Sequence, residues 1–322
     1  MDRSSLIGSS IAFSKMLSMI EKLAKLHAPV LIEGETGTGK ELAARSMHYG
    51  GQRCNKPFVP VNCGAFPEGL IESELFGHLK GSFTDARENH PGLVEAAAGG
   101  SLFLDEMDAL APKAQVALLR FLQDGSYRPI GSRTERKVDV RILAASNGNL
   151  DQLVASGAFR CDLLYRLRIL TLKLPPLRER GQDSLLLART FFSRCRQDHQ
   201  CVPRELDVSS CDWFDRYPWP GNVRELEAIV YREAMISDDE LLRLNAPVAF
   251  ASERRFAVDR RLCQFDGAAY ATAKTMAIEQ FDRHYLAALM KKANGNVSHA
   301  ARVAGKERRA LGKLLKKHGI SA

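Results

Sequence analysis

The sequence has no long apolar run and no signal peptide. No segment approaches the about 20 apolar residues that a transmembrane helix requires, and the amino-terminal MDRSSLIGSS lacks an apolar core. The seven cysteines form no C-x-x-C pair and are odd in number, which argues against a disulfide framework and a structural zinc site. We therefore expect a cytoplasmic protein that does not enter a membrane and whose cysteines are reduced, mostly packing residues.

The positive charge of the chain lies at its carboxy-terminal end. Residues 268–322 hold eleven Lys or Arg and three Asp or Glu, whereas the preceding residues hold 35 of each sign, so the whole net charge of +8 belongs to this last segment. A basic segment beside a neutral body indicates a polyanionic partner, and nucleic acid is favoured over a membrane surface. A solvated helix face is the alternative, and charge alone does not separate the two.

Helical and strand-like apolar patterns alternate along the first half of the chain. Its 322 residues exceed the about 250 to 300 at which a single core stops growing, so two or three units are expected. The alternation predicts an α/β fold with a parallel sheet that ends near Pro175. We expect strands at residues 28–32, 58–61, 101–104, 138–145 and 167–172. We expect helices at residues 11–26, 185–196, 223–236, 276–293, 297–303 and 306–317.

These patterns divide the chain into four segments. After the sheet come amphipathic helices with few strand signals, which predict a small helical domain. Periodicity then weakens and charges mix with small residues, as in a linker. We expect an α/β domain at residues 1–173, a helical domain at 174–240, a linker at 241–268 and a basic helical domain at 269–322.

A glycine-rich segment, GETGTGK, joins the first expected strand to a helical pattern. In this context its backbone N–H groups can surround phosphates, the helix amino terminus adds positive potential, and Lys40 can reach the β and γ phosphates. Glu41 departs from the usual P-loop, because Ser or Thr at this position helps to hold magnesium. The expected ATP-binding residues of this segment are Gly34, Glu35, Thr36, Gly37, Thr38, Gly39, Lys40 and Glu41.

A second segment, LFLDE, reads as a buried strand that ends in two carboxylates. Asp105 would bind Mg²⁺ directly or through water, and Glu106 would polarise the attacking water. An acidic pair after a strand is alternatively a solvated turn or a helix cap. The P-loop upstream favours the catalytic interpretation, with ATP and Mg²⁺ as the cofactors.

Taken together, the motifs resemble one family nearly from end to end: the NtrC-type bacterial enhancer-binding proteins, AAA+ activators of sigma-54 RNA polymerase. Glu41 matches the usual residue of this family. The resemblance implies an AAA+ P-loop parallel sheet with a helical lid subdomain. The motifs that carry it are GETGTGKE, SLFLDE, VNCGAF (61–66), ESELFGH (72–78), RILAASN (141–147), FRCDLLYRL (159–167), LPPLRER (174–180) and WPGNVRELE (219–227).

The resemblance also assigns roles to single polar residues. Asn62 is similar to the switch residue that holds the catalytic glutamate, and Asn147 to the sensor that orients water near the γ-phosphate. Arg160 and Arg166 would be arginine fingers that reach into a neighbouring subunit, which requires a ring, usually a hexamer. Arg224 would report the nucleotide state to the lid. Without the motifs, each arginine would be read as a surface salt bridge.

The segment FGHLKGSFTDA resembles the family's surface loop GAFTGA, which contacts sigma-54 and remodels the closed promoter complex. Gly81 to Ala86 keep the aromatic and hydroxyl positions tied to that contact, Phe83 and Thr84. Asp85 replaces a glycine and adds a charge where the loop needs positive φ, a conformation that aspartate tolerates better than most residues. Phe83 alternatively packs into its own domain.

The last segment has the layout of a helix-turn-helix and resembles the Fis-type DNA-binding unit of enhancer-binding proteins. Arg308, Arg309 and Lys313 are the expected contacts to double-stranded DNA. Gly312 is unfavourable in a recognition helix by about 1 kcal/mol in propensity. An ordinary basic helical hairpin is the alternative.

We expect, in sum, a transcription activator that binds an upstream enhancer-like DNA site, assembles into a homo-oligomeric ring and uses ATP to remodel sigma-54 RNA polymerase. The chain starts a few residues before the ATPase core, which leaves no room for a receiver or GAF domain. Control would then come from expression, from a regulatory partner protein or from assembly on DNA.

Two other classes of function stay open. The first is a DNA-binding regulator whose ATP site controls assembly without productive sigma-54 engagement, which Asp85 favours and the intact Asp105 and Glu106 oppose. The second is a nucleic-acid motor such as a helicase, for which the FGHLKGSFTDA loop would have no use.

Overall fold

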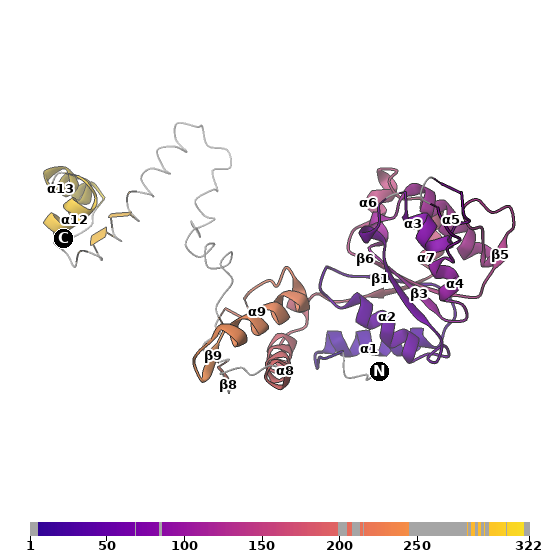
Figure 1. Cartoon of the computed structure of the whole chain (residues 1–322). Helices are drawn as coiled ribbons and strands as arrows, with labels where there is room; N and C mark the ends of the chain where they lie inside the picture. Colours follow the sequence, from indigo (N-terminus) through magenta and orange to yellow (C-terminus); the bar gives the residue numbers. More distant parts are fainter. Residues whose placement is uncertain are drawn as a thin grey trace. The chain divides into compact units, whose positions relative to one another are not determined.

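The computed structural model of the chain forms two compact units, residues 1–246 and residues 247–322, which we treat separately. Figure 1 shows the helices and strands of both. The described residues are 6–67, 69–83, 86–198, 205–207, 213–214, 216–244, 282, 285–286, 289–290, 293, 296–306 and 308–318.

The first unit is built on a five-stranded sheet in which every neighbouring pair is parallel, in the order β2-β3-β6-β1-β7. This confirms the expected α/β class. The observed strands are β1 (Val30–Glu33), β2 (Phe58–Asn62), β3 (Ser101–Asp105), β6 (Arg141–Ser146) and β7 (Leu170–Lys173).

Three strands were expected to begin earlier than they do: β1 starts at Val30 rather than at residue 28, and two others differ by more. Arg136–Lys137 (β5) pairs antiparallel with Ser126–Tyr127 (β4), outside the large sheet, so β6 starts only at Arg141. Residues up to Leu167 belong to a helix, and β7 starts at Leu170. Apolar residues continue across both boundaries, so hydrophobicity alone does not mark them.

Helices cover both faces of the sheet (Figure 1). Alternate residues of each strand point to opposite faces: Val30 and Ile32 pack in one apolar core, and Leu31 packs in the other. The first core holds α1 (Ile11–Ala24) and α2 (Lys40–Tyr49). The other face carries the remaining helices of the sheet region, α3 (Ile71–Phe76), α4 (Leu93–Ala96), α5 (Pro112–Asp124), α6 (Leu150–Ala155) and α7 (Cys161–Leu167).

The lid follows the sheet and consists mainly of two long helices, α8 (Asp183–Asp198) and α9 (Asn222–Ile236). This confirms the expected helical domain. The structure adds a short parallel pair that the sequence did not predict, β8 (Glu205–Asp207) with β9 (Leu241–Arg243). Strand β9 lies within the range expected as a linker. It was not expected there because three residues are too few to show a periodic apolar pattern. The exact domain boundaries stay a prediction.

The described part of the second unit is helical. Helices α12 (Val297–Val303) and α13 (Arg308–Lys317) flank Gly305, whose φ is +61°. Asn296 caps α12 by accepting from two backbone amides, as an N-cap residue does. The expected helix at 276–293 lies largely outside the described residues. Its described members share one core with the two helices, formed by Leu286, Leu289, Met290, Ala293, Ala300, Ala301, Leu311 and Leu315.

The structure bears on two further features of the sequence, its apolar segments and its cysteines. No helix among the described residues is long and apolar enough to cross a membrane. Of the cysteines that the structure describes, Cys63 and Cys195 are buried as expected, whereas Cys54 and Cys161 are exposed. Burial raises the pKa of the Cys63 thiol to about 12.

Candidate functional site

The nucleotide loop, defined here as Gly34 to Lys40, runs from the end of β1 into the first turn of α2. Two of its glycines adopt left-handed backbone, Gly37 at φ +78° and Gly39 at φ +96°, a conformation that other residues rarely adopt. The Thr38 hydroxyl donates to the Glu35 carbonyl at 2.8 Å. The loop therefore wraps around the helix amino terminus, where backbone N–H groups favour an anion.

Lys40 is the buried cation of this loop. Its ammonium group donates to the Gly34 carbonyl at 2.8 Å, to the Glu35 carbonyl at 3.1 Å and to Asn147 Oδ1. Burial lowers the pKa of Lys40, while the nearby carboxylates, Asp105 first among them, oppose the shift. The ammonium charge of Lys40 is thus poorly solvated and lies next to the space that phosphate oxygens can occupy.

Parallel strands bring the polar partners to the same edge of the sheet. Asp105 ends β3, and Asn147 follows β6, the strand between β3 and β1. Burial raises the pKa of Asp105, and a 2.9 Å hydrogen bond from the Glu106 amide opposes the shift. Glu106 adopts left-handed backbone at φ +54°. Such backbone in a non-glycine residue is costly and occurs often at functional sites.

These residues enclose one cavity of about 240 Å³. Nine of the expected site residues line it, so the structure brings the nucleotide loop, the acidic pair, the sensor and the lid together. Three further lining residues were not singled out from the sequence: Leu42, Val223 and Glu227. The expected residues at the cavity are Thr36, Gly37, Gly39, Lys40, Glu41, Asp105, Glu106, Asn147 and Arg224.

Asn62 lies beside the cavity at the end of β2 rather than in its wall. Its side-chain oxygen accepts from the Gly64 amide at 2.8 Å. A Cβ atom on Gly64 would lie 2.5 Å from Glu106 Oε2 and 3.3 Å from Asn62 Oδ1. Gly64 therefore leaves the space in which Asn62 and Glu106 approach each other, a role that the sequence did not single out.

Arg160 and Arg166 are two further expected catalytic residues that do not line the cavity of their own chain. Arg160 pairs with Asp162 at 2.7 Å on the surface, and the hydrogen bonds that its guanidinium donates to this carboxylate raise the pKa of Arg160. Arg166 is exposed in the last turn of α7. Both side chains therefore lie where a neighbouring molecule can meet them.

The acidic pair fits Mg²⁺ together with a nucleotide. Among the described residues, no group of three or more His, Cys, Asp or Glu could hold a metal ion by itself. Mg²⁺ in nucleotide sites is usually held by one or two carboxylates and by phosphate oxygens. Asp105 supplies such an oxygen donor at the same cavity as Lys40 and the nucleotide loop.

The segment Gly81 to Ala86, which we call the remodelling loop after the role expected of it from the sequence, follows α3 in the chain. The Gly81 amide donates to the Ala86 carbonyl at 2.8 Å, which closes the base of the loop. The Phe83 ring packs half-buried on the His78 ring, with 4.8 Å between centroids. Thr84 and Asp85 lie outside the described residues.

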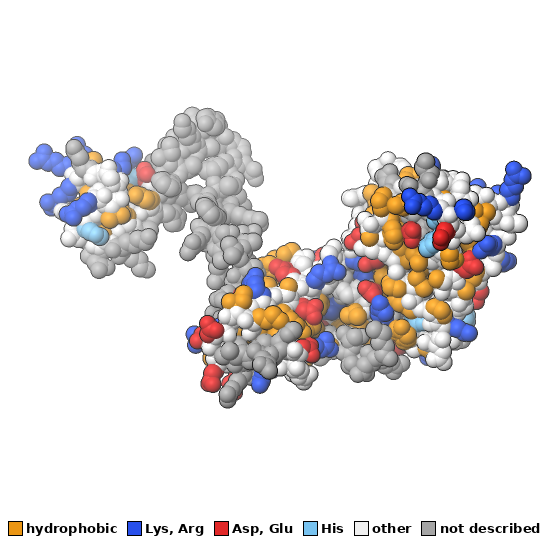
Figure 2. Space-filling view, in the orientation of Figure 1, with side chains coloured by type: hydrophobic (Ala, Val, Ile, Leu, Met, Phe, Trp, Pro, Cys, Tyr) orange, Lys and Arg blue, Asp and Glu red, His pale blue; other side chains and the backbone are white. Residues whose placement is uncertain are grey.

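The second unit presents basic side chains on its surface (Figure 2). Arg308 and Arg309 are exposed at the start of α13, and Lys313 is exposed one turn later. The apolar residues Leu311 and Leu315 of the same helix point into the core. Helix α13 is therefore divided into a packed face and a cationic face, as in a DNA-reading helix.

Three known families match consecutive parts of the chain. Residues 6–173 match the Sigma-54 interaction domain, residues 178–254 the AAA+ ATPase lid domain, and residues 277–318 the Fis family of bacterial regulatory proteins. The chain belongs to the sigma-54 interaction family of bacterial regulators. The parallel sheet, the helical lid and the helix-turn-helix are therefore those of this family.

Curated relatives extend the match over nearly the whole chain. The phenol regulator MopR of Acinetobacter guillouiae is 39% identical over 312 residues, which are 97% of this chain and 56% of MopR. The DNA-binding transcriptional regulator NtrC of Azospirillum brasilense is 40% identical over 331 residues, 97% of this chain and 69% of NtrC. The chain thus spans only part of the length of these relatives.

A solved structure of the family shows the same arrangement of elements. NtrX from Brucella abortus, crystallised in complex with ATP, aligns with a TM-score of 0.69 and 32% identity. The alignment covers 98% of this chain and 69% of the NtrX chain.

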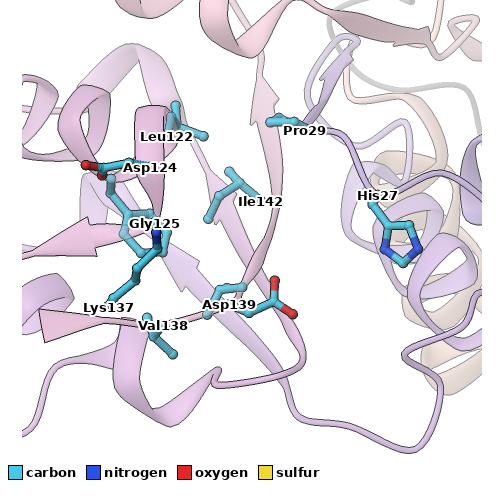
Figure 3. Close-up of a pocket in the computed structure, with 11 residues that line it drawn as sticks. His27, Pro29, Leu122, Asp124, Gly125, Lys137, Val138, Asp139 and Ile142 are labelled. Atoms are coloured by element: carbon cyan, nitrogen blue, oxygen red, sulfur yellow. The ribbon is translucent and has the colours of Figure 1, made fainter.

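A larger cavity lies at the opposite edge of the sheet (Figure 3). It measures about 410 Å³ and opens near the amino ends of β1 and β6, beside Pro29 and Ile142. Its acidic residues already have partners, because Asp139 pairs with Arg53 and Asp124 accepts from Ser126. None of the expected site residues of this family member lines it.

Proposed function

We propose that this chain is an ATP-dependent transcription activator that binds upstream DNA, assembles into a ring and remodels sigma-54 RNA polymerase. The observation that supports this most is the single cavity that joins Lys40, Asp105, Glu106, Asn147 and the lid residue Arg224. These are the groups that ATP hydrolysis coupled to lid movement requires.

Each group has a defined part in the proposed reaction. The N–H groups of the nucleotide loop and Lys40 bind the phosphates, and Asp105 holds Mg²⁺, which offsets negative charge on the phosphate oxygens. Glu106 orients and polarises the attacking water, and Asn147 helps to fix that water near the γ-phosphate. Asn62 holds Glu106 until the remodelling loop engages its client.

The proposed ring completes the site with Arg160 and Arg166 from a neighbouring subunit. A guanidinium can offset the charge that develops on the γ-phosphate. The exposure of both side chains, away from the cavity of their own chain, supports a role in a neighbouring site. Because Arg160 is paired with Asp162, that pair would have to open during assembly.

The proposed surfaces for sigma-54 and for DNA are formed by different segments of the chain. Phe83 and Thr84 would contact sigma-54, and the half-exposed ring of Phe83 is suited to anchor a partner. Arg308, Arg309 and Lys313 would contact DNA, as their exposure on one face of α13 supports.

Opening of a sigma-54 promoter by purified polymerase tests the proposal. The native chain should form open complexes with ATP, and Phe83→Ala should hydrolyse ATP within about twofold of native yet open no promoter. Tyr49→Ala, a second partly exposed aromatic of the same unit, controls for the loss of aromatic surface. A native chain that neither binds nor hydrolyses ATP would exclude this function.

A DNA-binding regulator that does not engage sigma-54 productively is the second candidate function. The observation that favours it is Asp85, which stands where the family's loop has glycine. If the native chain hydrolyses ATP but opens no promoter, while Asp85→Gly opens it, this second function is the correct one.

A further inference from the structure

One residue of the nucleotide loop carries a negative charge although the loop is built to bind phosphate. The carboxylate of Glu35 accepts two hydrogen bonds from the Arg178 guanidinium, at 2.6 and 2.8 Å. Such a bidentate pair fixes both the distance and the plane of the two groups. The hydrogen bonds from Arg178 and Asn222 lower the pKa of Glu35 to about 2, so the pair is ionised at neutral pH.

The same carboxylate also contacts Asn222, the first residue of lid helix α9. The Asn222 amide donates to Glu35 Oε2 at 3.1 Å and to the Thr36 carbonyl at 3.0 Å, and its oxygen accepts from the Leu177 amide at 2.8 Å. Asn222 is fully buried and adopts φ +50°, a left-handed conformation that asparagine tolerates better than most residues. One side chain therefore joins the nucleotide loop, the segment after the sheet and the lid.

These contacts fix the start of the helix that carries Arg224. The next residue of α9, Val223, donates its amide to the Gly37 carbonyl at 3.0 Å. Arg224, two residues after Asn222, lines the nucleotide cavity. A displacement of the nucleotide loop at Glu35 is thus transmitted directly to the position of Arg224.

We propose that Glu35, Arg178 and Asn222 form a latch that positions the lid, and with it Arg224, according to the conformation of the nucleotide loop. The latch rests on the proposed ATPase function. Its members are positioning residues, because the Glu35 carboxylate and the Arg178 guanidinium bind each other and neither lines the cavity. Arg178 has a second role: it neutralises a carboxylate that would otherwise repel the phosphates.

The two roles predict an asymmetry between single and double variants. Glu35→Gln removes the charge and weakens the latch, whereas Arg178→Ala also leaves an unpaired carboxylate in the phosphate loop. Arg178→Ala should therefore raise the Kd for Mg-ATP about tenfold, and adding Glu35→Gln to it should return the Kd to within about threefold of the Glu35→Gln value. Asp139→Asn is the matched control, because Asp139 forms a similar bidentate pair with Arg53 at the opposite edge of the sheet.

Amide hydrogen exchange tests the latch without any need for nucleotide. In the full chain, peptides that contain Leu177 and Val223 should exchange at least fivefold faster in Glu35→Gln and Arg178→Ala than in the native chain, and at the native rate in Asp139→Asn. Native exchange in both latch variants, or a double variant that binds Mg-ATP more weakly than Arg178→Ala, would overturn the latch. A native chain that binds no ATP would instead refute the ATPase function, while the exchange rates would still decide the latch.

Steady-state kinetics separate positioning from general stability. If the latch acts through Arg224, Glu35→Gln should lower kcat severalfold in the native background but less than twofold in an Arg224→Ala background. Equal losses in both backgrounds would mean that Glu35 does not act through Arg224, and would contradict the proposal.

Discussion

The nucleotide loop and the remodelling loop both turn on a left-handed glycine, but the two glycines have opposite surroundings. Gly37 has φ +78° and Gly81 has φ +81°. A Cβ atom on Gly37 would lie 2.2 Å from the carbonyl oxygen of Gly221, the residue before lid helix α9. A Cβ atom on Gly81 would meet no heavy atom of the described residues within 4 Å.

This difference shows how each loop is fixed in place. The nucleotide loop is held by its own chain, through the Lys40 and Thr38 hydrogen bonds and through the lid. The remodelling loop is held at its base, where Gly81 pairs with Ala86, and by the Phe83 ring on His78. We infer that the first loop is preformed for its ligand, whereas the described residues of the second are held only near its base and through the Phe83 ring.

The largest effect should follow from changing the chemistry of the nucleotide cavity without changing its shape. Glu106→Gln keeps the size of the side chain but removes the base, so kcat for ATP hydrolysis should fall at least about 100-fold. The Kd for Mg-ATP should stay within about threefold, because Lys40 and the loop amides are unchanged. A phosphate-release assay measures kcat, and equilibrium titration measures the Kd for Mg-ATP.

Glu21→Gln on the exposed face of α1 is the control for this change, and should leave both quantities at native values. Hydrolysis by Glu106→Gln within tenfold of native would assign the activation of water to another residue.

A smaller effect should come from filling the space at Gly37. Gly37→Ala adds a methyl group that overlaps the Gly221 carbonyl, and it also forces alanine into left-handed backbone, which alone costs about 1 to 2 kcal/mol. The free energy of unfolding of the first unit should therefore fall by more than about 2 kcal/mol, and Mg-ATP affinity should fall as the lid is displaced. Urea unfolding and titration measure these losses.

Gly81→Ala is the matched control, since it has the same φ and open space. Its free energy of unfolding should fall only by the about 1 to 2 kcal/mol that left-handed backbone costs an alanine, and its Mg-ATP affinity should be unchanged. Equal losses in the two variants would show that contact with the lid does not distinguish the loops.

Residues that belong to a motif at the end of a strand were predicted to lie together, whereas contacts between residues far apart in sequence and the part played by small residues were not. The carboxyl ends of parallel strands must meet at one edge, so the motifs correctly predicted that Lys40, Asp105 and Asn147 converge. Gly64 gave no signal of its own, because its part depends on how Glu106 lies against it. Glu35 was expected as one of the ATP-binding residues of the loop, and no motif marked the contact of its carboxylate with Arg178, 143 residues away in sequence.

A third glycine, Gly312, makes it possible to separate the effect of backbone conformation on stability from the effect of available space. Gly312 lies within α13, in helical backbone, and a Cβ atom there would meet nothing within 4 Å. Gly312→Ala should therefore stabilise the second unit by about 1 kcal/mol, the difference in helix propensity. Gly305→Ala, at φ +61°, should destabilise the same unit. Hydrogen exchange of α13 in the full chain measures both, and a destabilising Gly312→Ala would indicate a contact that the helix makes elsewhere.

The smallest effect on stability should come from lowering the pH, which protonates Glu35 of the nucleotide loop. The pKa of Glu35 is lowered to about 2 from an ordinary value of 4.5, so its ion pair with Arg178 contributes fully above pH 4.5 and is lost as the pH falls toward 2. Because both groups are partly exposed, the contribution is at most about 1 kcal/mol. The difference in the free energy of unfolding between the native chain and Glu35→Gln should be equal at pH 7 and pH 5.5 and smaller at pH 3. Among its described residues, Gly81 to Phe83 and Ala86, the remodelling loop has no ionisable side chain with which to compare this effect. A difference that is unchanged at pH 3 would mean that hydrogen bonding from Asn222, rather than charge, holds the nucleotide loop to the lid.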